Sequence, residues 1–163
     1  MDETEPRWLS AQERQAWLTL SILMTTLPPA LDAQLERDAG LNYYEYIVLA
    51  MLSAEPGRAL PMSRLSLVTA GSLSRLSNVV KRLEARDYVG RVPHPEDRRV
   101  KVVRLLDAGL AALVAAAPAH VEHVRDLVLD AVPAADLGHL TRTLRRVLDR
   151  VDPEGFPALD GPT

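Results

Sequence analysis

The chain has 163 residues, 47% of them hydrophobic and 25% charged, and a net charge of −3, which is the composition of one soluble globular domain. It has no cysteine, and this excludes disulfide scaffolds, thiolate metal sites and thiol redox sensing. Residues 1–7 carry acids where a secretory signal needs bases, and no apolar run approaches the roughly 20 residues of a membrane span, so we expect a cytoplasmic protein with no membrane partner.

Helices are predicted in the N-terminal part of the chain. Aromatic residues make up only 4%, so aliphatic side chains must fill the core, and their spacing is that of helices. Residues 1–9 show no period and are expected to be disordered. Ser10 and Glu13 form a capping box that begins the first helix. Pro28-Pro29 is expected to kink or break this helix, because two amide donors are lost, and to leave a second piece from Ala30 to Asp38.

The centre of the chain has the spacing of a helix-turn-helix. After a helix that Asn42 and Glu45 should cap, the helical patterns 62–68 and 73–85 are separated only by Thr69-Ala70-Gly71. Ser72 is a good N-cap for the second pattern. Its apolar stripe, expected to face the core, consists of Leu73, Leu76, Val80 and Leu83, and its opposite face carries Ser74, Arg75, Asn78, Lys81 and Arg82.

A β-wing and two further helices are predicted in the remaining sequence. Two β-rich runs, 88–92 and 100–105, enclose a polar tip. Asp107 is expected to cap a long helix to Val128 with a kink at Pro118.

A last helix is predicted to follow, and Pro133 is expected in its first turn. It should end at Val151. Residues 153–163 hold three prolines and two glycines and are expected to form a flexible tail.

Positive charge is concentrated in the segment that holds the helix-turn-helix and the wing. Residues 58–104 contain eleven Lys and Arg against four Asp and Glu, a net charge of +7, so the other residues carry −10. A basic block in an acidic chain is typical of proteins that bind a polyanion, because neutralised phosphates release counterions. A solvated basic surface is the alternative that charge alone leaves open.

Two segments carry a recognisable pattern. One is Gly71-Ser72-Leu73-Ser74-Arg75-Leu76-Ser77-Asn78-Val79-Val80-Lys81-Arg82-Leu83-Glu84; the other is Pro95-Glu96-Asp97-Arg98-Arg99 followed by Leu105-Leu106-Asp107-Ala108-Gly109. Together they resemble the multiple-antibiotic-resistance regulators, the MarR family, over about residues 10–152. The resemblance implies a mainly α fold in which helices flank a winged helix-turn-helix, and the function of a transcriptional regulator, commonly a repressor.

The sequence departs from the family pattern at two places. Asp87 stands where such proteins usually have Gly at the end of the recognition helix, and Asp tolerates a left-handed backbone less well. Pro28-Pro29 is unusual in what resembles the first dimerisation helix.

The outer face of the 73–85 helix has residue types that read DNA. Arginine can bind guanine, and asparagine adenine, through two hydrogen bonds, so Arg75 and Asn78 are predicted to contact bases. The residues predicted mainly to position the helix are Ser72, Ser74, Lys81 and Arg82. The alternative is the solvated face of an amphipathic helix.

In the wing, the resemblance implies that one arginine enters the minor groove while the preceding aspartate orients it. Arg99 and Asp97 are the candidates, and Arg98 would contact phosphate. An ordinary charged hairpin tip is the alternative.

A homodimer is expected, because one reading helix and one wing bury too little surface for tight binding. The resemblance implies a two-fold dimer that reads a pseudo-palindromic operator with half-site centres roughly 34–36 Å apart. The expected regions are an N-terminal dimerisation region (10–40), a winged helix-turn-helix DNA-binding domain (41–106) and C-terminal dimerisation helices (107–152).

A small-molecule effector is also implied by the resemblance, in a crevice between the dimer helices and the winged domain. Residues that could line it are Trp17, Met24, Tyr44 and Met51, although side chains of these types are more often core or dimer contacts. A zinc-responsive regulator using His120, His123 and His139 is an alternative, with Glu122, Asp126 or Asp136 as further candidate ligands. No cysteine or second closely spaced histidine pair completes the set, so neither a metal site nor a cofactor is predicted.

Patterns typical of enzymes are not found in the sequence. There is no glycine-rich phosphate loop, Gly-x-Ser-x-Gly elbow or His-Glu-x-x-His motif, so we expect no enzymatic activity. The stronger rival to a DNA-binding regulator is a winged-helix module that binds proteins, since the same fold also serves without DNA.

Overall fold

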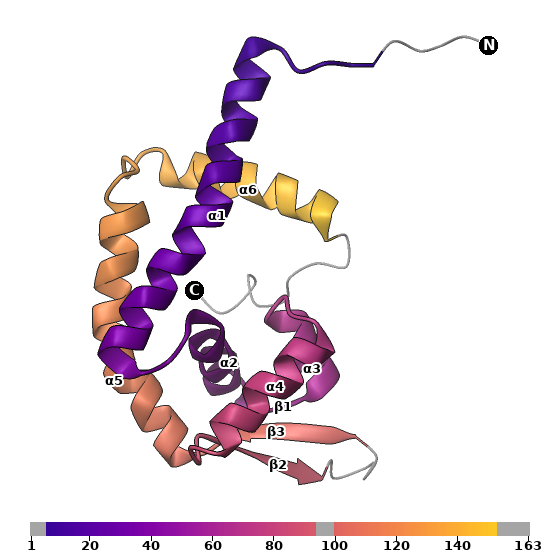
Figure 1. Cartoon of the computed structure of the whole chain (residues 1–163), viewed down its shortest axis with the longest axis vertical. Coiled ribbons are helices and arrows are strands. Elements are labelled where there is room, and N and C mark those ends of the chain that lie inside the picture. The colour runs from indigo at the N-terminus through magenta and orange to yellow at the C-terminus, as the bar shows by residue number, and fades with distance from the viewer. Residues whose placement is uncertain (1–5, 94–99, 153–163) are drawn as a thin grey trace, which may run out of the picture.

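The computed structural model describes residues 6–93 and 100–152, which form helices and one small sheet that lies at one end of the molecule (Figure 1). The helices are α1 (Ala11–Ala39), α2 (Tyr43–Ala54), α3 (Met62–Val68), α4 (Leu73–Glu84), α5 (Asp107–Val124) and α6 (Leu137–Val151), with a 3-10 turn η1 (Pro56–Arg58) and a π turn η2 (Arg125–Leu129). The strands are β1 (Ala59–Pro61), β2 (Val89–Pro93) and β3 (Lys101–Leu105). This architecture confirms the predicted mainly α fold with a β-wing. The expected tail, and the expected disorder of residues 1–5, lie outside the described residues.

The main core lies where α2, α3 and α4 pack against the sheet. Its fully buried side chains are Leu41, Val48, Leu49, Leu52, Leu65, Leu76, Val80, Leu83 and Val103. Burying one aliphatic side chain stabilises a fold by about 1.5–3 kcal/mol. Three of these residues belong to α4, so the core fixes the position of this helix.

Helix α1 is continuous, and the predicted break at Pro28-Pro29 is wrong. Both prolines lie inside one helix of 29 residues. They remove the amides that would bond the carbonyls of Met24 and Thr25, but both of these residues are exposed, so water can satisfy the carbonyls. Beyond the prolines, the buried side chains of Leu31 and Leu35 anchor the rest of the helix.

The N-terminal caps of α1 and α2 are as predicted. Glu13 N donates to Ser10 Oγ (3.3 Å) and Ser10 N to Glu13 Oε2 (2.8 Å). The Asn42–Glu45 pair makes the same two bonds at the start of α2, at 2.8 and 3.1 Å.

Two expected helix starts are wrong. Leu106, not Asp107, is the N-cap of α5, and the exposed Asp107 carboxylate pairs with Arg58 at 3.4 Å. Pro133 precedes α6 by a turn in which Asp136 N donates to the Pro133 carbonyl (2.8 Å). The long helix predicted to reach Val128 ends instead at Val124, the last residue of α5, and the π turn η2 follows it.

The predicted wing hairpin is present in the described residues, and β1 adds a strand that the sequence analysis missed. Strand β3 pairs antiparallel with both neighbours, so that the sheet order is β1-β3-β2. Strand β1 has only three residues, too short for a period-2 pattern to be recognised.

Asp87 adopts a left-handed conformation, with φ +55°, at the turn after α4. The turn is closed by Tyr88 N donating to the Leu83 carbonyl (3.0 Å), the bond of a helix end that usually contains glycine. Replacing Asp87 with Gly should therefore raise the free energy of unfolding by about 0.5–1 kcal/mol. Urea denaturation at fixed protein concentration measures this change. Asp87→Ala keeps the Cβ atom and should give no gain; a destabilised glycine variant would contradict the strain argument.

His120 joins α5 to α1 and α2 in a second buried cluster. Gln34 donates its amide to Asp38 Oδ2 (2.9 Å), so its Oε1 faces His120 Nδ1 at 3.0 Å, and Nδ1 is the donor. The imidazole also packs against the rings of Tyr46 and Tyr43, with centroids 4.4 and 5.9 Å away. Burial, aided by repulsion from His123, lowers the pKa of His120 below its usual 6.5.

Acidification should therefore destabilise the fold through His120. The unfolded chain takes up the proton at a higher pH than the folded chain, so this contribution to stability is present at neutral pH and is lost as the pH falls below about 6.5. Denaturation of wild type and His120→Gln between pH 7.5 and 5.5 measures the effect, and the variant should show the weaker pH dependence. Equal slopes would contradict the assignment.

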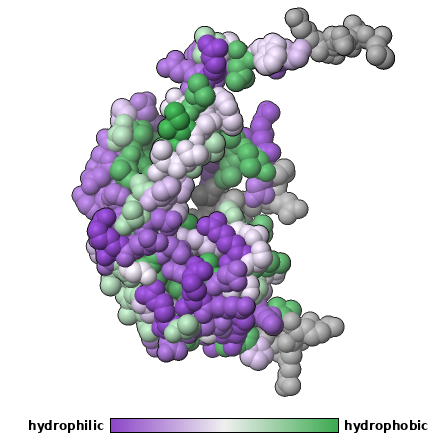
Figure 2. Space-filling model, in the orientation of Figure 1, coloured by the Kyte–Doolittle hydropathy of each residue, from purple (hydrophilic) through white to green (hydrophobic). Residues whose placement is uncertain are grey.

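The terminal helices carry large apolar side chains on their surfaces. Trp17 and Ile22 of α1 are 54% and 62% exposed, and Val151 of α6 is 77% exposed. Figure 2 shows hydrophobic residues gathered around α1 and α6, whereas this face of the winged part is mostly hydrophilic. Within residues 6–93 and 100–152, no helix has both the length and the hydrophobicity to cross a membrane.

Candidate nucleic-acid interface

Helix α4 presents the predicted polar face to solvent. Ser72 caps it by accepting a hydrogen bond from Arg75 N at 3.2 Å, and Ser72 Oγ lies 3.1 Å from Ser74 Oγ. The exposed residues of α4 and its cap include all six that the sequence analysis selected: Ser72, Ser74, Arg75, Asn78, Lys81 and Arg82.

The buried side of α4 differs from the predicted stripe at one position. Leu76, Val80 and Leu83 are fully buried as expected. Leu73 is instead 55% exposed, and Val79 takes its place in the core at 3% exposure. Leu73 is the first residue of α4, and it borders a surface hollow with Leu148 and Val151 of α6.

Arg75 stacks on Tyr44 of α2. Its guanidinium carbon lies 4.1 Å from the ring centroid, a cation–π distance. The Tyr44 hydroxyl in turn lies 2.9 Å from Thr69 Oγ1 in the turn between α3 and α4. Arg75, Asn78 and Arg82 all border one hollow of about 330 Å³, whose other walls include Asp32 and Glu36 of α1.

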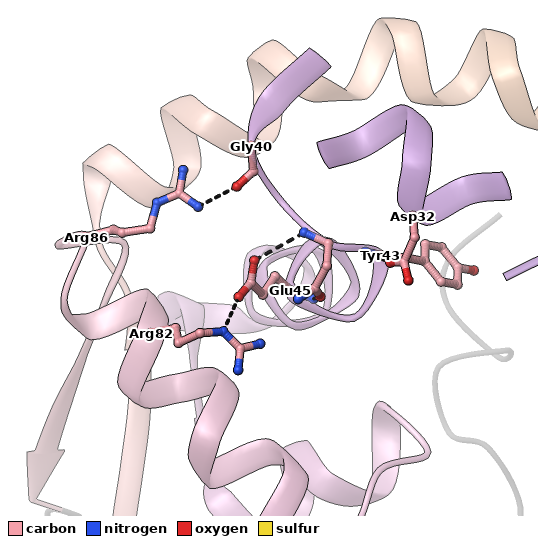
Figure 3. Close-up of polar contacts among 7 residues, drawn as sticks. Asp32, Gly40, Tyr43, Glu45, Arg82 and Arg86 are labelled. Carbon is pink, nitrogen blue, oxygen red and sulfur yellow. Dashed lines mark hydrogen bonds and ion pairs between the residues drawn. The ribbon is translucent and has the colours of Figure 1, made fainter. Parts of the chain in front are cut away.

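Arg82 pairs with the buried Glu45, as Figure 3 shows. Its Nε donates to Glu45 Oε1 at 2.8 Å, while Glu45 Oε2 accepts the Asn42 amide of the capping box. Nearby, Asp32 of α1 accepts the Tyr43 amide at 2.6 Å. The start of α2 is thus bonded to both α1 and α4.

Arg86, just beyond α4, joins it to the end of α1. Its Nη1 donates to the Gly40 carbonyl at 2.7 Å (Figure 3), and its Nη2 donates to the Tyr88 hydroxyl at 3.0 Å. At the base of the wing, Arg91 of β2 pairs with Glu84 at 3.4 Å. These contacts set the hairpin beside α4, as Figure 1 also shows.

The three wing residues proposed from the sequence, Asp97, Arg98 and Arg99, lie outside the described residues. The strands that lead to them, β2 and β3, are described, and their register pairs Pro93 with Lys101.

In the part of the chain that the structure describes, the four candidate effector residues lie in different surroundings. Met24 borders an apolar hollow of about 550 Å³ between α1 and α6, whereas Tyr44 borders the hollow beside Arg75. Trp17 is exposed on α1, and Met51 packs against the main core.

The three histidines considered for zinc lie on two helices, His120 and His123 on α5 and His139 on α6. His120 is bonded to Gln34 in the α1–α5 cluster, whereas His139 lies on α6 beside a different hollow. In the described part of the chain, no group of three His, Asp or Glu is placed to hold a metal ion.

The contacts of Tyr44, Glu45 and Arg86 were missed by sequence reasoning. The pairs Tyr44–Arg75, Glu45–Arg82 and Gly40–Arg86 are 31, 37 and 46 positions apart in sequence, and no local period reports such pairs. A partial signal was Glu45 itself, because a capping-box carboxylate has a second oxygen free for another partner.

Comparisons with known proteins agree with this geometry. A family model described as MarR family matches residues 39–100, the segment from the α1–α2 corner to the wing. The transcriptional regulator PapX of Escherichia coli is 32% identical over 71 residues, which is 44% of this chain and 43% of PapX, so the match spans less than half of that relative.

Two solved structures match over most of their length. Sco3205 of Streptomyces coelicolor, a MarR family transcriptional regulator solved in complex with DNA, is 36% identical with a TM-score of 0.87, over 92% of this chain and 94% of that one. AbsC, a MarR family regulator from the same organism, is 32% identical with a TM-score of 0.85, over 90% and 98%. With the helix-turn-helix, the wing and the flanking helices in place, this chain belongs to the MarR family of transcriptional regulators.

Proposed function

We propose that the chain is a sequence-specific double-stranded DNA-binding regulator that acts in the cytoplasm as a homodimer. Helix α4 of each subunit enters the major groove and each wing the adjacent minor groove, so that the dimer reads a pseudo-palindromic operator. The protein acts as a repressor, and a small-molecule effector releases it.

The observation that carries this proposal is the outer face of α4. An α-helix fits the major groove, and a reading helix needs short polar or basic side chains outside and an apolar face inside. Helix α4 has both, with Arg75 and Asn78 as the base-reading candidates on its exposed side. Ser72 caps the N-terminus of α4 close to Arg75, and a helix N-terminus favours a bound phosphate.

The homodimer is supported by the exposed apolar residues of the terminal helices. Soluble monomers rarely expose contiguous apolar patches above a few hundred Å². Here, α1 and α6 expose Trp17, Ile22 and Val151 and border an apolar hollow that contains Leu20 and Leu144. A second copy would cover these side chains and supply the second reading helix.

Selection of bound duplexes from a random pool tests the proposal. We expect an inverted repeat with half-site centres about one helical turn apart, bound at least about a thousandfold more tightly than a scrambled duplex at the same salt concentration. The affinity should fall steeply with salt, and the solution mass should be that of two chains.

Each part of the proposal has an outcome that overturns it. No enriched site and a shallow salt dependence would favour a protein-binding winged helix. A monomeric mass at micromolar concentration would overturn the dimer. Repression and release are tested by transcription from a promoter that carries the selected site, with and without candidate ligands; unchanged transcription on adding the protein would overturn the repressor assignment.

A further inference from the structure

We propose that the first turn of α2 supports the two arginines of the α4 reading face, with Tyr44 and Glu45 as positioning residues for DNA recognition. The inference rests on the proposed function and assigns a role to two residues that would not touch the duplex. Tyr44 acts on Arg75 and Glu45 acts on Arg82.

The Tyr44 ring is held rigidly below the Arg75 guanidinium. Thr69 Oγ1 donates to the Leu65 carbonyl at 2.8 Å, so the Tyr44 hydroxyl is the donor in its 2.9 Å bond to Thr69. A Cβ atom at Gly71 would overlap this hydroxyl, so the turn between α3 and α4 closes over the end of the ring. The support under Arg75 is therefore part of the buried core.

Stacking on Tyr44 leaves the hydrogen-bonding capacity of Arg75 available. A cation–π contact engages the ring face through the charge of the guanidinium, so the in-plane N–H donors of Arg75 remain available for the two acceptors of guanine. Because the ring restricts the orientation of the group before binding, less conformational freedom is lost on contact with DNA.

Glu45 supports Arg82 through an ion pair, which also restricts the orientation of the arginine side chain. Glu45 is 6% exposed, and its two carboxylate oxygens accept hydrogen bonds from Arg82 Nε and the Asn42 amide. Arg82 bonds Glu45 through Nε, so its two terminal nitrogens are not used in this bond. The Arg82 side chain is still 52% exposed. Arg82 can thus meet a phosphate while it remains paired.

Tyr44 and Glu45 are adjacent in sequence, so one turn of α2 sets the position of both arginines. The same turn is bonded to α1 through Asp32 and the Tyr43 amide. The positions of Arg75 and Arg82 relative to each other are consequently fixed by the packing of α2 and not by α4 alone.

A double-mutant cycle tests the Tyr44 arm, using the duplex that the wild type selects and a scrambled duplex. Tyr44→Leu should weaken binding to the selected duplex about two- to five-fold, with a smaller effect on the scrambled one. In the Arg75→Ala background the same change should have no further effect. Tyr44→Phe, which keeps the ring, should preserve the coupling to Arg75, and thermal unfolding of each variant verifies that it is folded.

The matched cycle for the other arm uses Glu45→Gln and Arg82→Ala. Glutamine retains the capping box but not the charge, so α2 stays intact. We expect an affinity loss of about two- to five-fold that disappears when Arg82 is alanine.

Two kinds of result would overturn the proposal. Equal losses with and without the partner arginine would make Tyr44 and Glu45 purely structural. Tighter binding by Glu45→Gln would mean that the pair withholds Arg82 from DNA. If the wild type selects no duplex, the proposed function itself fails; if it does select one and the cycles show no coupling, only this inference fails.

Discussion

Replacing Arg75 with alanine should cost about 1–3 kcal/mol of binding free energy on the selected duplex, which is roughly a 5- to 150-fold loss of affinity. The reason is that one arginine can make two hydrogen bonds to guanine, and Arg75 lies exposed on α4 with its guanidinium carbon 4.1 Å from the centroid of the Tyr44 ring. The loss should be specific: duplexes with another base at the contacted position should bind wild type and variant with similar affinity.

Lys81→Ala is the matched control for this prediction. Lys81 lies on the same exposed face of α4, where a single positive charge serves to contact phosphate. Its loss should weaken binding by a similar factor on all duplexes and reduce the log–log salt slope by about 1. Fluorescence anisotropy at several salt concentrations separates the two patterns, and a sequence-independent loss for Arg75→Ala would refute its role as a base reader.

Gly109→Ala should destabilise the fold by about 2–3 kcal/mol. Gly109 is buried in the first turn of α5, and a Cβ atom there would overlap the Tyr88 carbonyl oxygen and lie 2.9 Å from Leu105 Cδ1. The carbonyl cannot easily move away, because it accepts the Leu106 amide at 3.0 Å. This close approach gives a physical reason for glycine in the Asp107-Ala108-Gly109 motif.

Gly138→Ala provides the opposite case in the same protein. Gly138 lies on the exposed surface of α6, where a Cβ atom would meet only the end of the Arg142 side chain at 3.4 Å. Alanine there should stabilise the helix by about 0.5–1 kcal/mol. Urea denaturation of both variants measures the contrast, and a neutral Gly109→Ala would show that α5 can shift away from the sheet.

Local signals in the sequence predicted the parts of the fold that depend on neighbouring residues. The Ser10–Glu13 and Asn42–Glu45 boxes fixed two helix starts, and the short turn 69–71 placed α3 and α4 correctly. The polar face of α4 was also predicted, because it follows from helical periodicity and an apolar side that must be buried.

The remaining features depend on what surrounds a residue and not on its neighbours in sequence. Pro28-Pro29 is tolerated because the residues whose carbonyls lose a donor are exposed to water, and Leu73 lies beside a surface hollow next to α6 instead of in the core. The stacking of Arg75 on Tyr44 and the pairing of Arg82 with Glu45 arise from the crossing of α2 and α4. A periodic pattern identifies which face of a helix is exposed, but it does not identify the residues of other helices that contact this face.

The bond from Arg86 to Gly40 attaches the end of α4 to the residue that ends α1. Together with the Asp32–Tyr43 and Glu45–Arg82 bonds, it links α1, α2 and α4 to one another, so we expect a tilt of α1 to displace α4 as well. In a two-fold dimer, the same displacement of α4 would occur in both subunits. In the proposed dimer, we therefore expect the angle between the two α1 helices to set the half-site spacing that the two α4 helices can span.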